Sequence, residues 1–319
     1  MTQSMLRAAV IGVGYLGRFH AQKYAQLPGV TLVGVADSDP ATASAVAAEL
    51  GVPAVANYEE LLGNVDAISI AVPTPLHFEI AGQFLRRGVH VLVEKPITTT
   101  VEQAEQLIRL AQAGRCVLQV GHLERFNPAI LAISDRLRAP RFVESHRLAP
   151  FKQRGTDVSV VLDLMIHDID LIQELVQAPI ESIDAVGASI FSNDLDIVNA
   201  RIRFRNGCVA NTTASRVSLK QERKIRIFQD DAYMSLDLQQ KVVTTIRKKT
   251  AAPVESPAQV TIEEESFEQG DALKAEIEAF VNSIRTHTAP VVTGEDGLRA
   301  LETALRIAEL IRLNTQPRI

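Results

Sequence analysis

The sequence predicts an α/β chain, with a doubly wound parallel sheet followed by an α+β domain that has a large open mixed or antiparallel sheet. Two observations support this prediction. From Leu6 to Val120, short apolar segments alternate with helical ones, as in a parallel sheet covered by helices. From Ile180 to about Phe267, short alternating strands are separated by turn signals such as Asn206-Gly207. Because 319 residues exceed what one hydrophobic core usually serves, we expect two domains.

A glycine-rich segment after the first strand predicts a phosphate-binding turn. The apolar strand Leu6–Ile11 is followed at once by Gly12, Gly14 and Gly17, and then by a helix. A G-x-G-x-x-G triplet placed between a strand and a helix is typical of the dinucleotide-binding Rossmann fold. Gly12 would permit the tight turn, Gly14 the approach of a pyrophosphate, and Gly17 the close packing of the helix. The candidate cofactor contacts at the helix start are Tyr15 and Leu16, whose N–H groups would face the phosphates.

An acidic residue ends the second expected strand, Thr31–Ala36, and indicates which dinucleotide binds. Asp37 at this position can accept hydrogen bonds from the adenosine ribose hydroxyls and repels a 2′-phosphate. Its alternative role, capping the next helix, is less favoured because Asp39 and Pro40 already supply an N-cap and a first-turn proline. We therefore expect NAD rather than NADP, although the small neighbour Ser38 would tolerate both.

A lysine follows the strand expected at Val89–Glu94. Lys95 stands directly after this strand, and Pro96 biases it toward extended geometry and stops the strand ladder. An ammonium group is thus expected at the carboxyl end of a strand, where open α/β sheets bind their ligands. A solvated loop lysine is the ordinary alternative. The remaining elements of this half are strands at 67–72 and 117–120, a helix at 75–87, and a helix to about 113 opened by a capping box, Thr99-x-x-Glu102. The candidate cofactor contacts here are Pro73, Thr74, Pro75, His77, Glu94 and Lys95.

The pattern changes after Gly121, where a second domain is expected to begin. We predict a dinucleotide-binding domain at 1–122, a substrate-binding and oligomerisation domain at 123–288, and a C-terminal segment at 289–319. Asn127 and Pro128 read as the capped start of a helix, which is an alternative to substrate contact for Asn127. The other expected elements are a helix to about 138, a strand at 141–148, a polar loop at 150–157, and helices at 158–176, 272–286 and 294–313.

Several motifs occur together and in order along the chain. They are Gly12-x-Gly14-x-x-Gly17-x-x-His20, Thr74-Pro75-x-His77, Glu94-Lys95-Pro96, Gly121-His122-x-x-Arg125-Phe126-Asn127-Pro128, Asp163-x-x-x-His167 and the tail Val292–Leu298. The set resembles the glucose–fructose oxidoreductase and inositol dehydrogenase family, Gfo/Idh/MocA, nearly from end to end. The resemblance implies an NAD(P)-dependent oxidoreductase, a C-terminal helix that packs back on the nucleotide domain, a cis Lys95–Pro96 bond, and a homodimer or homotetramer formed through the open sheet.

Asp163 and His167 lie four residues apart on a predicted helix, so both face the same way. Taken alone, they are an ordinary pair on an apolar helix, beside Asp168 and Asp170 on an expected solvated face. The resemblance implies that they lie opposite Lys95 and that all three are catalytic. Oxidation of a secondary alcohol needs a base near the working pH, which suits His167. Lys95 could be the base if burial lowers its pKa, or a cationic donor to the forming alkoxide.

A narrower resemblance concerns Val120–Pro128 and His146–Phe151, which are similar to a branch that acts on UDP-sugars. It implies oxidation of carbon 3 of UDP-N-acetylglucosamine. An inositol or free-sugar dehydrogenase, a reductase, and a non-catalytic NAD-binding sensor remain alternatives. Two phosphate charges would need partners, with solvated loop cations as the ordinary alternative. The candidate substrate contacts are Lys95, His122, Arg125, Asn127, Arg147, Lys152, Arg154 and His167; His146 is expected near the same crevice, and His20 is expected to pack its helix.

Composition excludes several classes of function. A net charge of −5 and a charged fraction of 22% give no reason to expect nucleic-acid or membrane binding. The strand near the N-terminus leaves no room for a signal peptide, and no apolar run has the roughly 18 residues of a membrane span. Cys116 and Cys208 have no metal-type spacing. We expect a cytoplasmic protein with no metal site.

Overall fold

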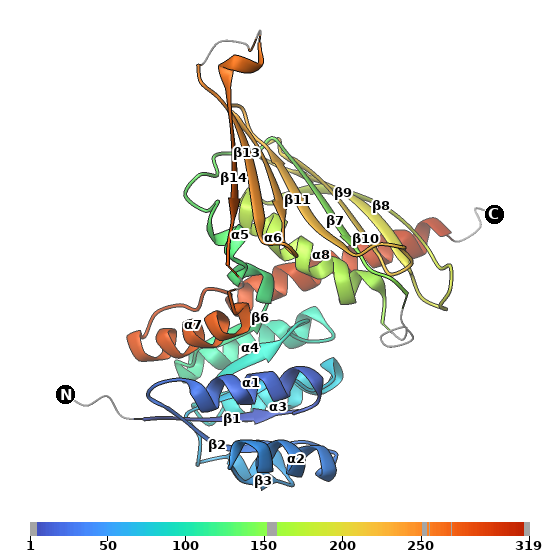
Figure 1. Cartoon of the computed structure of the whole chain (residues 1–319). Coiled ribbons are helices and arrows are strands. Elements are labelled where there is room, and N and C mark those ends of the chain that lie inside the picture. The colour runs from blue at the N-terminus through green and yellow to red at the C-terminus, as the bar shows by residue number, and fades with distance from the viewer. Residues whose placement is uncertain (1–4, 152–157, 251–253, 255, 269, 316–319) are drawn as a thin grey trace. The chain divides into compact units, whose positions relative to one another are not determined.

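The chain folds into two compact units in a computed structural model, which describes residues 5–151, 158–250, 254, 256–268 and 270–315 (Figure 1). Unit 1 comprises Met1–Leu123 and Asp271–Leu301, and unit 2 comprises Glu124–Gly270 and Glu302–Ile319. This division differs from the sequence prediction on the C-terminal side. The helix expected at 272–286 belongs to unit 1, and the last long helix is shared between the units.

Unit 1 is built on a six-stranded parallel sheet with the order β3-β2-β1-β4-β5-β6. Its strands are β1 (Leu6–Ile11), β2 (Val30–Ala36), β3 (Ala54–Val55), β4 (Ala67–Ile70), β5 (His90–Glu94) and β6 (Leu118–Gly121). Its helices are α1 (Tyr15–Gln26), α2 (Pro40–Leu50), α3 (His77–Leu85), α4 (Val101–Gly114), α7 (Ala272–Thr286) and the first part of α8 (Gly294–Thr315), with short turns η1 (Tyr58–Leu61) and η2 (Thr74–Leu76). The order reverses between β1 and β4, which is the switch point where doubly wound sheets bind ligands. The predicted fold class is confirmed for this unit.

Local sequence signals set where the helices of unit 1 begin. The Asp39 side chain accepts hydrogen bonds from the N–H groups of Ala41 and Thr42, so α2 starts as predicted. The capping box at Thr99 was misplaced by one residue. Thr100 is the N-cap of α4, and its hydroxyl accepts a hydrogen bond from the N–H of Gln103.

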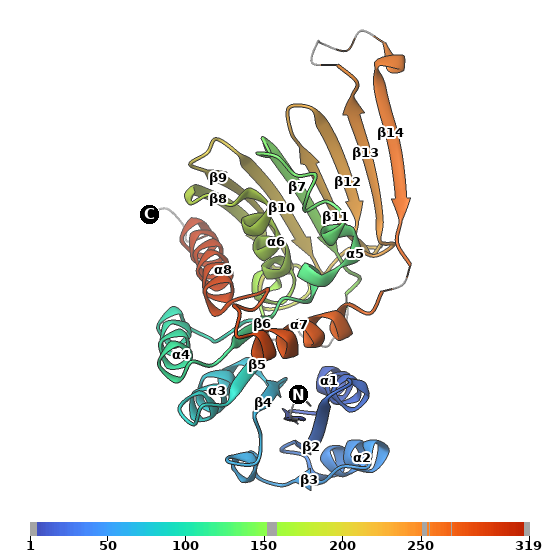
Figure 2. The same ribbon diagram turned by 90° about the vertical axis from the view of Figure 1, so that its left-hand side faces the viewer.

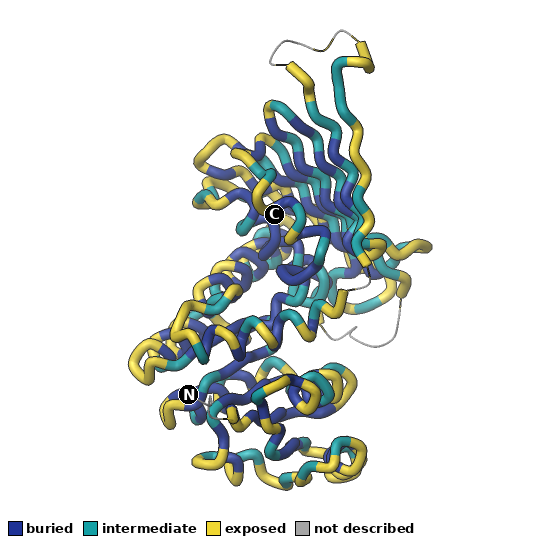
Figure 3. Tube along the Cα trace, turned by 60° about the vertical axis from the view of Figure 1, so that its left-hand side comes forward, coloured by how far each residue is buried: buried dark blue, intermediate teal, exposed yellow. Residues whose placement is uncertain are grey.

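The core of unit 1 includes α7, a helix distant in sequence from the sheet. Its side chains Ile277 and Phe280 are fully buried and belong to the same apolar cluster as Tyr24 of α1 and Val10 of β1. The colours of Figure 3 show the strands of this unit as mostly buried. The start of α8 also lies against β6, because a Cβ atom at Gly297 would come within 2.6 Å of Val120.

Unit 2 is built on an eight-stranded sheet with the order β14-β13-β12-β11-β7-β10-β9-β8 (Figure 2). Its strands are β7 (Phe142–Leu148), β8 (Ile180–Ala188), β9 (Ile197–Phe204), β10 (Val209–Ser215), β11 (Glu222–Phe228), β12 (Ala232–Asp237), β13 (Val242–Lys248) and β14 (Val260–Ser266). All neighbours are antiparallel except β7 and β10, which run parallel. The sheet is therefore mixed, which is one of the two forms that the sequence left open.

The helical parts of unit 2 are shorter than predicted. They are η3 (Leu123–Phe126), α5 (Pro128–Leu131), a π-helical turn η4 (Val161–Met165), α6 (Ile166–Val176), η5 (Pro257–Gln259) and the end of α8. The helix predicted to reach 138 ends at Leu131, whose carbonyl oxygen accepts a hydrogen bond from the Ser134 hydroxyl. Such side-chain bonds compete with helix continuation. Among the described residues, no helix is both long and apolar enough to cross a membrane.

Candidate cofactor and active-site residues

The glycine-rich turn after β1 needs glycine at two positions for steric reasons. Gly12 has φ of 80°, and a Cβ atom there would lie 2.7 Å from the carbonyl oxygen of Ala71. A Cβ atom at Gly17 would fall 1.8 Å from the carbonyl oxygen of Gly12. At Gly14, by contrast, a Cβ atom would meet no atom of the described residues within 4 Å. Gly14 therefore borders open space, which is what the approach of a pyrophosphate requires.

The start of α1 suits an anion. Its N-cap is Gly14, so within the described residues no side chain caps the helix, and its first turn carries no acidic residue. The N–H groups of a helix start carry a partial positive charge and bind phosphate when they are not satisfied by a cap. Together with the open space at Gly14, this geometry fits the diphosphate of a dinucleotide.

Asp37 is held against the glycine-rich turn. Its Oδ2 accepts a hydrogen bond of 2.8 Å from the N–H of Val13, and its Oδ1 accepts one of 3.0 Å from the N–H of Asp39. Each carboxylate oxygen can accept a further hydrogen bond. The side chain is half-buried at the carboxyl end of β2, a position suited to the ribose hydroxyls of an adenosine.

His77 connects two backbone segments at the carboxyl edge of the parallel sheet. Its Nε2 lies 2.9 Å from the carbonyl oxygen of Val72, and its Nδ1 lies 2.9 Å from that of Pro96. Burial lowers the pKa of His77, while both carbonyls act in the opposite direction. The ring thus ties the end of β4 to the turn after β5. This contact favours a structural role for His77, which the sequence placed among the cofactor contacts.

The Glu94-Lys95-Pro96 turn ends β5 with a cis Lys95–Pro96 bond, as the resemblance implied. The carboxylate of Glu94 folds back over this turn, where its Oε2 accepts a hydrogen bond of 3.3 Å from the N–H of Lys95. Its Oε1 lies 3.2 Å from Nε2 of His20. His20 was expected simply to pack its helix, and the structure corrects this expectation. The carboxylate also requires Gly121, where a Cβ atom would lie 2.8 Å from Oε1.

The candidate catalytic residues of unit 2 lie on one continuous helical segment. Asp163 is within the π-helical turn η4, and His167 is the second residue of α6. Both are half-buried. Turns of π-helix are rare and occur frequently at functional sites. Lys95, their predicted catalytic partner, belongs to unit 1.

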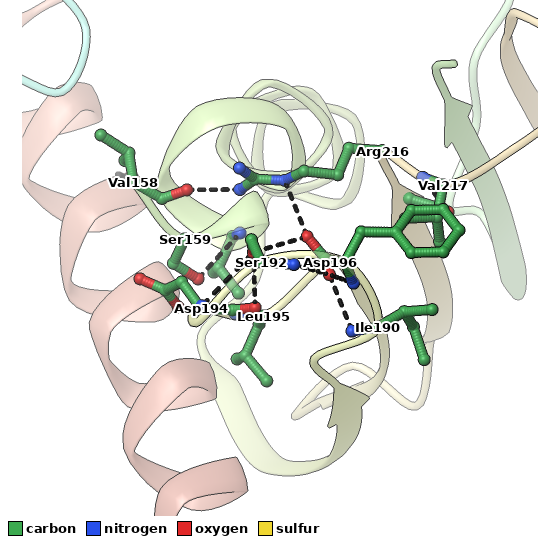
Figure 4. A network of polar contacts seen from close by, with 12 residues as sticks. Val158, Ser159, Ile190, Ser192, Asp194, Leu195, Asp196, Arg216 and Val217 are labelled. Atoms are coloured by element: carbon green, nitrogen blue, oxygen red, sulfur yellow. Dashed lines mark hydrogen bonds and ion pairs between the residues drawn. The ribbon is translucent and has the colours of Figure 1, made fainter. Parts of the chain in front are cut away.

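A polar network anchors the beginning of that helical segment (Figure 4). The buried carboxylate of Asp196 accepts hydrogen bonds from the N–H groups of Ile190, Phe191 and Ser192 and pairs with Arg216. Burial alone would raise the pKa of Asp196, but these donors hold it below its ordinary value. Arg216 donates to the carbonyl oxygen of Val158. In the same loop, the carbonyl oxygen of Leu195 accepts a hydrogen bond of 3.2 Å from the N–H of Val160. The chain entering η4 is therefore fixed by side-chain and backbone hydrogen bonds.

Two buried arginines hold the other side of α6. Arg125 forms a two-pronged pair with Asp170, with distances of 2.7 and 2.9 Å. Arg147 forms a similar pair with Asp168, at 2.9 and 3.1 Å, and also contacts Glu124 at 3.0 Å. The expectation that Asp168 and Asp170 form a solvated face was wrong, because both are buried. These pairs favour a structural role for Arg125 and Arg147 over the phosphate binding predicted from sequence.

The remaining candidates have varied surroundings. The amide of Asn127 donates to Glu124 and to the carbonyl oxygen of Leu238, and its oxygen accepts the N–H of Ala129, which confirms it as an N-cap. His122 is buried in unit 1, and His146 lies 3.5 Å from Glu222. Lys152 and Arg154 lie outside the described residues.

One functional candidate, Glu276 of α7, was missed by sequence reasoning. It is fully buried, and its carboxyl lies with His20 and Glu94 in a group whose ligand-type atoms are all within 4.8 Å of one another. Three residues from three distant elements leave no spacing signal in a single sequence. A buried glutamate within the apolar stripe of a helix was the available hint.

Comparison with known proteins gives whole-length matches. Residues 6–122 match the GFO_IDH_MocA family, described as an oxidoreductase family with an NAD-binding Rossmann fold, and residues 101–235 match its C-terminal domain. The chain is 42% identical over 303 residues to UDP-N-acetylglucosamine 3-dehydrogenase of Acidithiobacillus ferrooxidans, covering 95% of this chain and 96% of that protein. A solved structure of that enzyme superposes with a TM-score of 0.92 at 41% identity, covering 98% and 99% of the two chains. The chain is also 29% identical over 236 residues to scyllo-inositol 2-dehydrogenase (NAD(+)) of Bacillus subtilis, covering 68% of this chain and 69% of that protein.

Proposed function

We propose that this chain, which belongs to the GFO/IDH/MocA family of NAD-binding oxidoreductases, oxidises carbon 3 of UDP-N-acetylglucosamine to the 3-keto sugar. The observation that carries the choice of substrate is the match of 42% identity across 96% of a dehydrogenase with this activity. The match to the inositol dehydrogenase of Bacillus subtilis is lower, at 29% across 69% of that protein. A dehydrogenase of inositols is therefore the second candidate.

The residues of unit 1 would hold NAD, which supplies the hydride acceptor when bound. The open backbone at Gly14 and the uncapped start of α1 would receive the diphosphate. Asp37 would accept hydrogen bonds from the hydroxyls of the adenosine ribose. Its negative charge would repel the 2′-phosphate of NADP. The dinucleotide would then extend across the switch point toward the carboxyl ends of β4 and β5, where Thr74 and Lys95 follow the strands.

Three residues would act on the substrate hydroxyl. Lys95 would polarise the oxygen or take its proton, and His167 would take the proton with its ring oriented by Asp163. The carboxylate of Glu94 restrains Lys95 at its backbone N–H. The buried ion pairs and the Asp196 network restrain the segment that bears Asp163 and His167. Such restraint on both catalytic elements favours electrostatic preorganisation.

The charges of the UDP group need cationic partners. Because Arg125 and Arg147 are already paired with buried carboxylates, the remaining candidates for the diphosphate are Lys152 and Arg154, which lie outside the described residues.

We also propose that the protein is a homo-oligomer that uses the open face of the unit 2 sheet. A row of aromatic side chains crosses neighbouring strands there, with ring centroids of Phe142 and Phe228 5.5 Å apart and those of Phe228 and Tyr233 4.9 Å apart. These residues are partly exposed within one chain, and a second copy could cover them. Light scattering after size-exclusion chromatography measures the mass in solution, and a monomer would contradict this part. A cytoplasmic location stays a prediction.

The proposed activity is tested by following NADH formation with a panel of substrates. The panel contains UDP-N-acetylglucosamine, UDP-glucose, free N-acetylglucosamine, myo-inositol and scyllo-inositol, each with NAD and with NADP. We expect turnover with UDP-N-acetylglucosamine and NAD, with a product that has lost two hydrogen atoms by mass spectrometry. Turnover of inositols alone would establish the second candidate. Tight NAD binding without turnover of any substrate would indicate a binding protein.

A further inference from the structure

A buried polar cluster lies directly behind the Glu94–Lys95 turn in unit 1. His20 comes from α1, Glu94 from the end of β5 and Glu276 from α7. Their side chains are at most 13% exposed, and Glu276 is fully buried. The ligand-type atoms of all three residues lie within 4.8 Å of one another. Two carboxyl groups and one imidazole therefore share a space that water barely reaches.

Glu276 differs from the other two members in its contacts. His20 and Glu94 are joined by a hydrogen bond of 3.2 Å. Within the described residues, neither carboxyl oxygen of Glu276 has a hydrogen-bond partner. Its backbone carbonyl is held by the Gln119 side chain at 3.1 Å, so α7 keeps this carboxyl at the cluster. A charged carboxylate without partners is very unfavourable in such a place.

The groups around Glu276 decide its protonation. The charged neighbour of Glu276 is Glu94 on β5. The Glu94 carboxylate also accepts a hydrogen bond from the backbone N–H of Lys95. From α1, His20 faces the cluster, and Tyr24 bonds to Ser69 of β4 at 2.9 Å. From β6 the neighbour is the uncharged Gln119. Burial, and then the charge of Glu94, raise the pKa of Glu276 well above its ordinary value.

The cluster also lies where a dinucleotide would end. The glycine-rich turn follows β1, and the ribose-binding Asp37 follows β2 on one side of it. A dinucleotide bound across the switch point has its second half on the other side, at the carboxyl ends of β4 and β5. Glu94 is the last residue of β5. The nicotinamide carries a positive charge in NAD and none in NADH, so the charge of Glu94 and Glu276 affects the two forms differently.

We propose that Glu276, in its cluster with His20 and Glu94, carries a proton whose occupancy follows the redox state of the cofactor, and that Glu276 is a positioning residue acting through Glu94. When the cofactor is absent or reduced, Glu276 holds the proton. When the oxidised nicotinamide is bound, its positive charge favours loss of that proton to solvent. The cluster would then carry one more negative charge than it does without the oxidised cofactor. This inference rests on the NAD-dependent activity proposed above and does not depend on the identity of the sugar.

The direct hydrogen bond between His20 and Glu94 argues against a metal ion held by all three residues. Histidine and carboxylate side chains are both zinc ligands. Zinc bound through Nε2 of His20 would have to break its 3.2 Å contact with Oε1 of Glu94, whereas Nδ1 of His20 has no hydrogen-bond partner within the described residues. Zinc would also require Glu276 to be ionised before binding. Metal content of the purified protein is therefore one outcome of the experiment.

The experiment measures the dissociation constants of NAD and NADH by calorimetry between about pH 6 and pH 9, without substrate. A single linked proton changes the ratio of the two constants by at most about tenfold per pH unit. For the natural protein we expect preference for NAD over NADH to rise by roughly three- to tenfold across this range. In Glu276→Gln, which is neutral and of the same size, the preference should be nearly independent of pH. Glu278→Gln, the same change on an exposed position of α7, should behave like the natural protein.

Several results would overturn the proposal. A pH-dependent preference that persists in Glu276→Gln would assign the proton to another group, such as Lys95. A preference independent of pH in the natural protein would exclude a linked proton. Stoichiometric zinc in the purified protein, lost in Glu276→Gln, would assign the cluster to a metal. Failure to bind either cofactor would overturn this inference together with the proposed function, whereas normal binding without sugar turnover would overturn only the latter.

Discussion

Asp37 accepts a hydrogen bond of 2.8 Å from the backbone N–H of Val13. One carboxylate thereby serves both the glycine-rich turn and the predicted ribose site. We expect Asp37→Ala to weaken NAD binding by about 2 kcal/mol, because a charged acceptor is lost, and to reduce the preference for NAD over NADP.

Asp37→Asn separates the two roles of this residue. The amide oxygen can still accept a hydrogen bond from the N–H of Val13, while the acceptor for the N–H of Asp39 and the negative charge that repels a 2′-phosphate are both lost. Dissociation constants for both cofactors, measured by fluorescence titration, give the comparison. An unchanged ratio in both variants would refute the ribose assignment.

The two glycines Gly14 and Gly17 provide a matched pair of variants. Gly17→Ala would place a Cβ atom 1.8 Å from the carbonyl oxygen of Gly12, so we expect a large loss of stability or no folded protein. Gly14→Ala meets no atom of the described residues within 4 Å and should fold normally, yet its methyl group would occupy the phosphate space. We expect NAD affinity to fall by about tenfold or more, since close backbone approach is lost. Thermal unfolding and NAD titration measure both effects, and full affinity in Gly14→Ala would place the diphosphate elsewhere.

Lys95 is predicted to act in turnover more than in cofactor binding. Lys95→Ala should bind NAD nearly normally while kcat falls by about a hundredfold or more, the range found when one electrostatic or acid–base group is removed. Lys274→Ala, which removes a half-exposed lysine of α7, serves as the control. Turnover of Lys95→Ala within about twofold of the natural protein would remove Lys95 from the mechanism.

Glu276 should make the folded protein less stable as pH rises. When folding raises the pKa of a group, its contribution to stability is fully present only at a pH below the pKa of the unfolded state. The contribution is lost as the pH rises toward the pKa of the folded state. The pKa of Glu276 is raised by burial. Glu276→Gln should therefore be more stable than the natural protein above about pH 5, and the gap should widen by up to about 1.4 kcal/mol per pH unit. Urea unfolding across this range measures the gap, for which Glu278→Gln is again the control. A constant gap would mean that Glu276 is ionised in the folded state.

The sequence was most informative where a residue's neighbours in the chain determine its role. The turn at Gly12, Gly14 and Gly17, the cap at Asp39 and the strand ending at Glu94 all depend on local geometry, and the structure has them as predicted. The helix after Asn127 shows the limit of this reasoning. Its start was predicted correctly, but its length was not, because the Ser134 hydroxyl competes for a helix carbonyl.

Long-range pairing was the part that the sequence could not show. Arg147 and Asp168 are buried partners that come from a strand and a helix, and each alone reads as a solvated charge. The same holds for Glu276, whose neighbours His20 and Glu94 are far away in the sequence. A charge that is buried against another charge leaves no periodic pattern, so a single sequence gives no means to choose its partner.

The parallel pairing of β7 with β10 has a consequence for how unit 2 is made. Parallel neighbours cannot be joined by a hairpin and need a crossover connection. Here the chain between these strands contains η4 and α6, and hence Asp163 and His167. The same connection continues through β8 and β9, which pair on the far side of β10. The two side chains predicted to be catalytic therefore lie on the crossover that the parallel pair requires, so the topology of the sheet and the placement of these residues are linked.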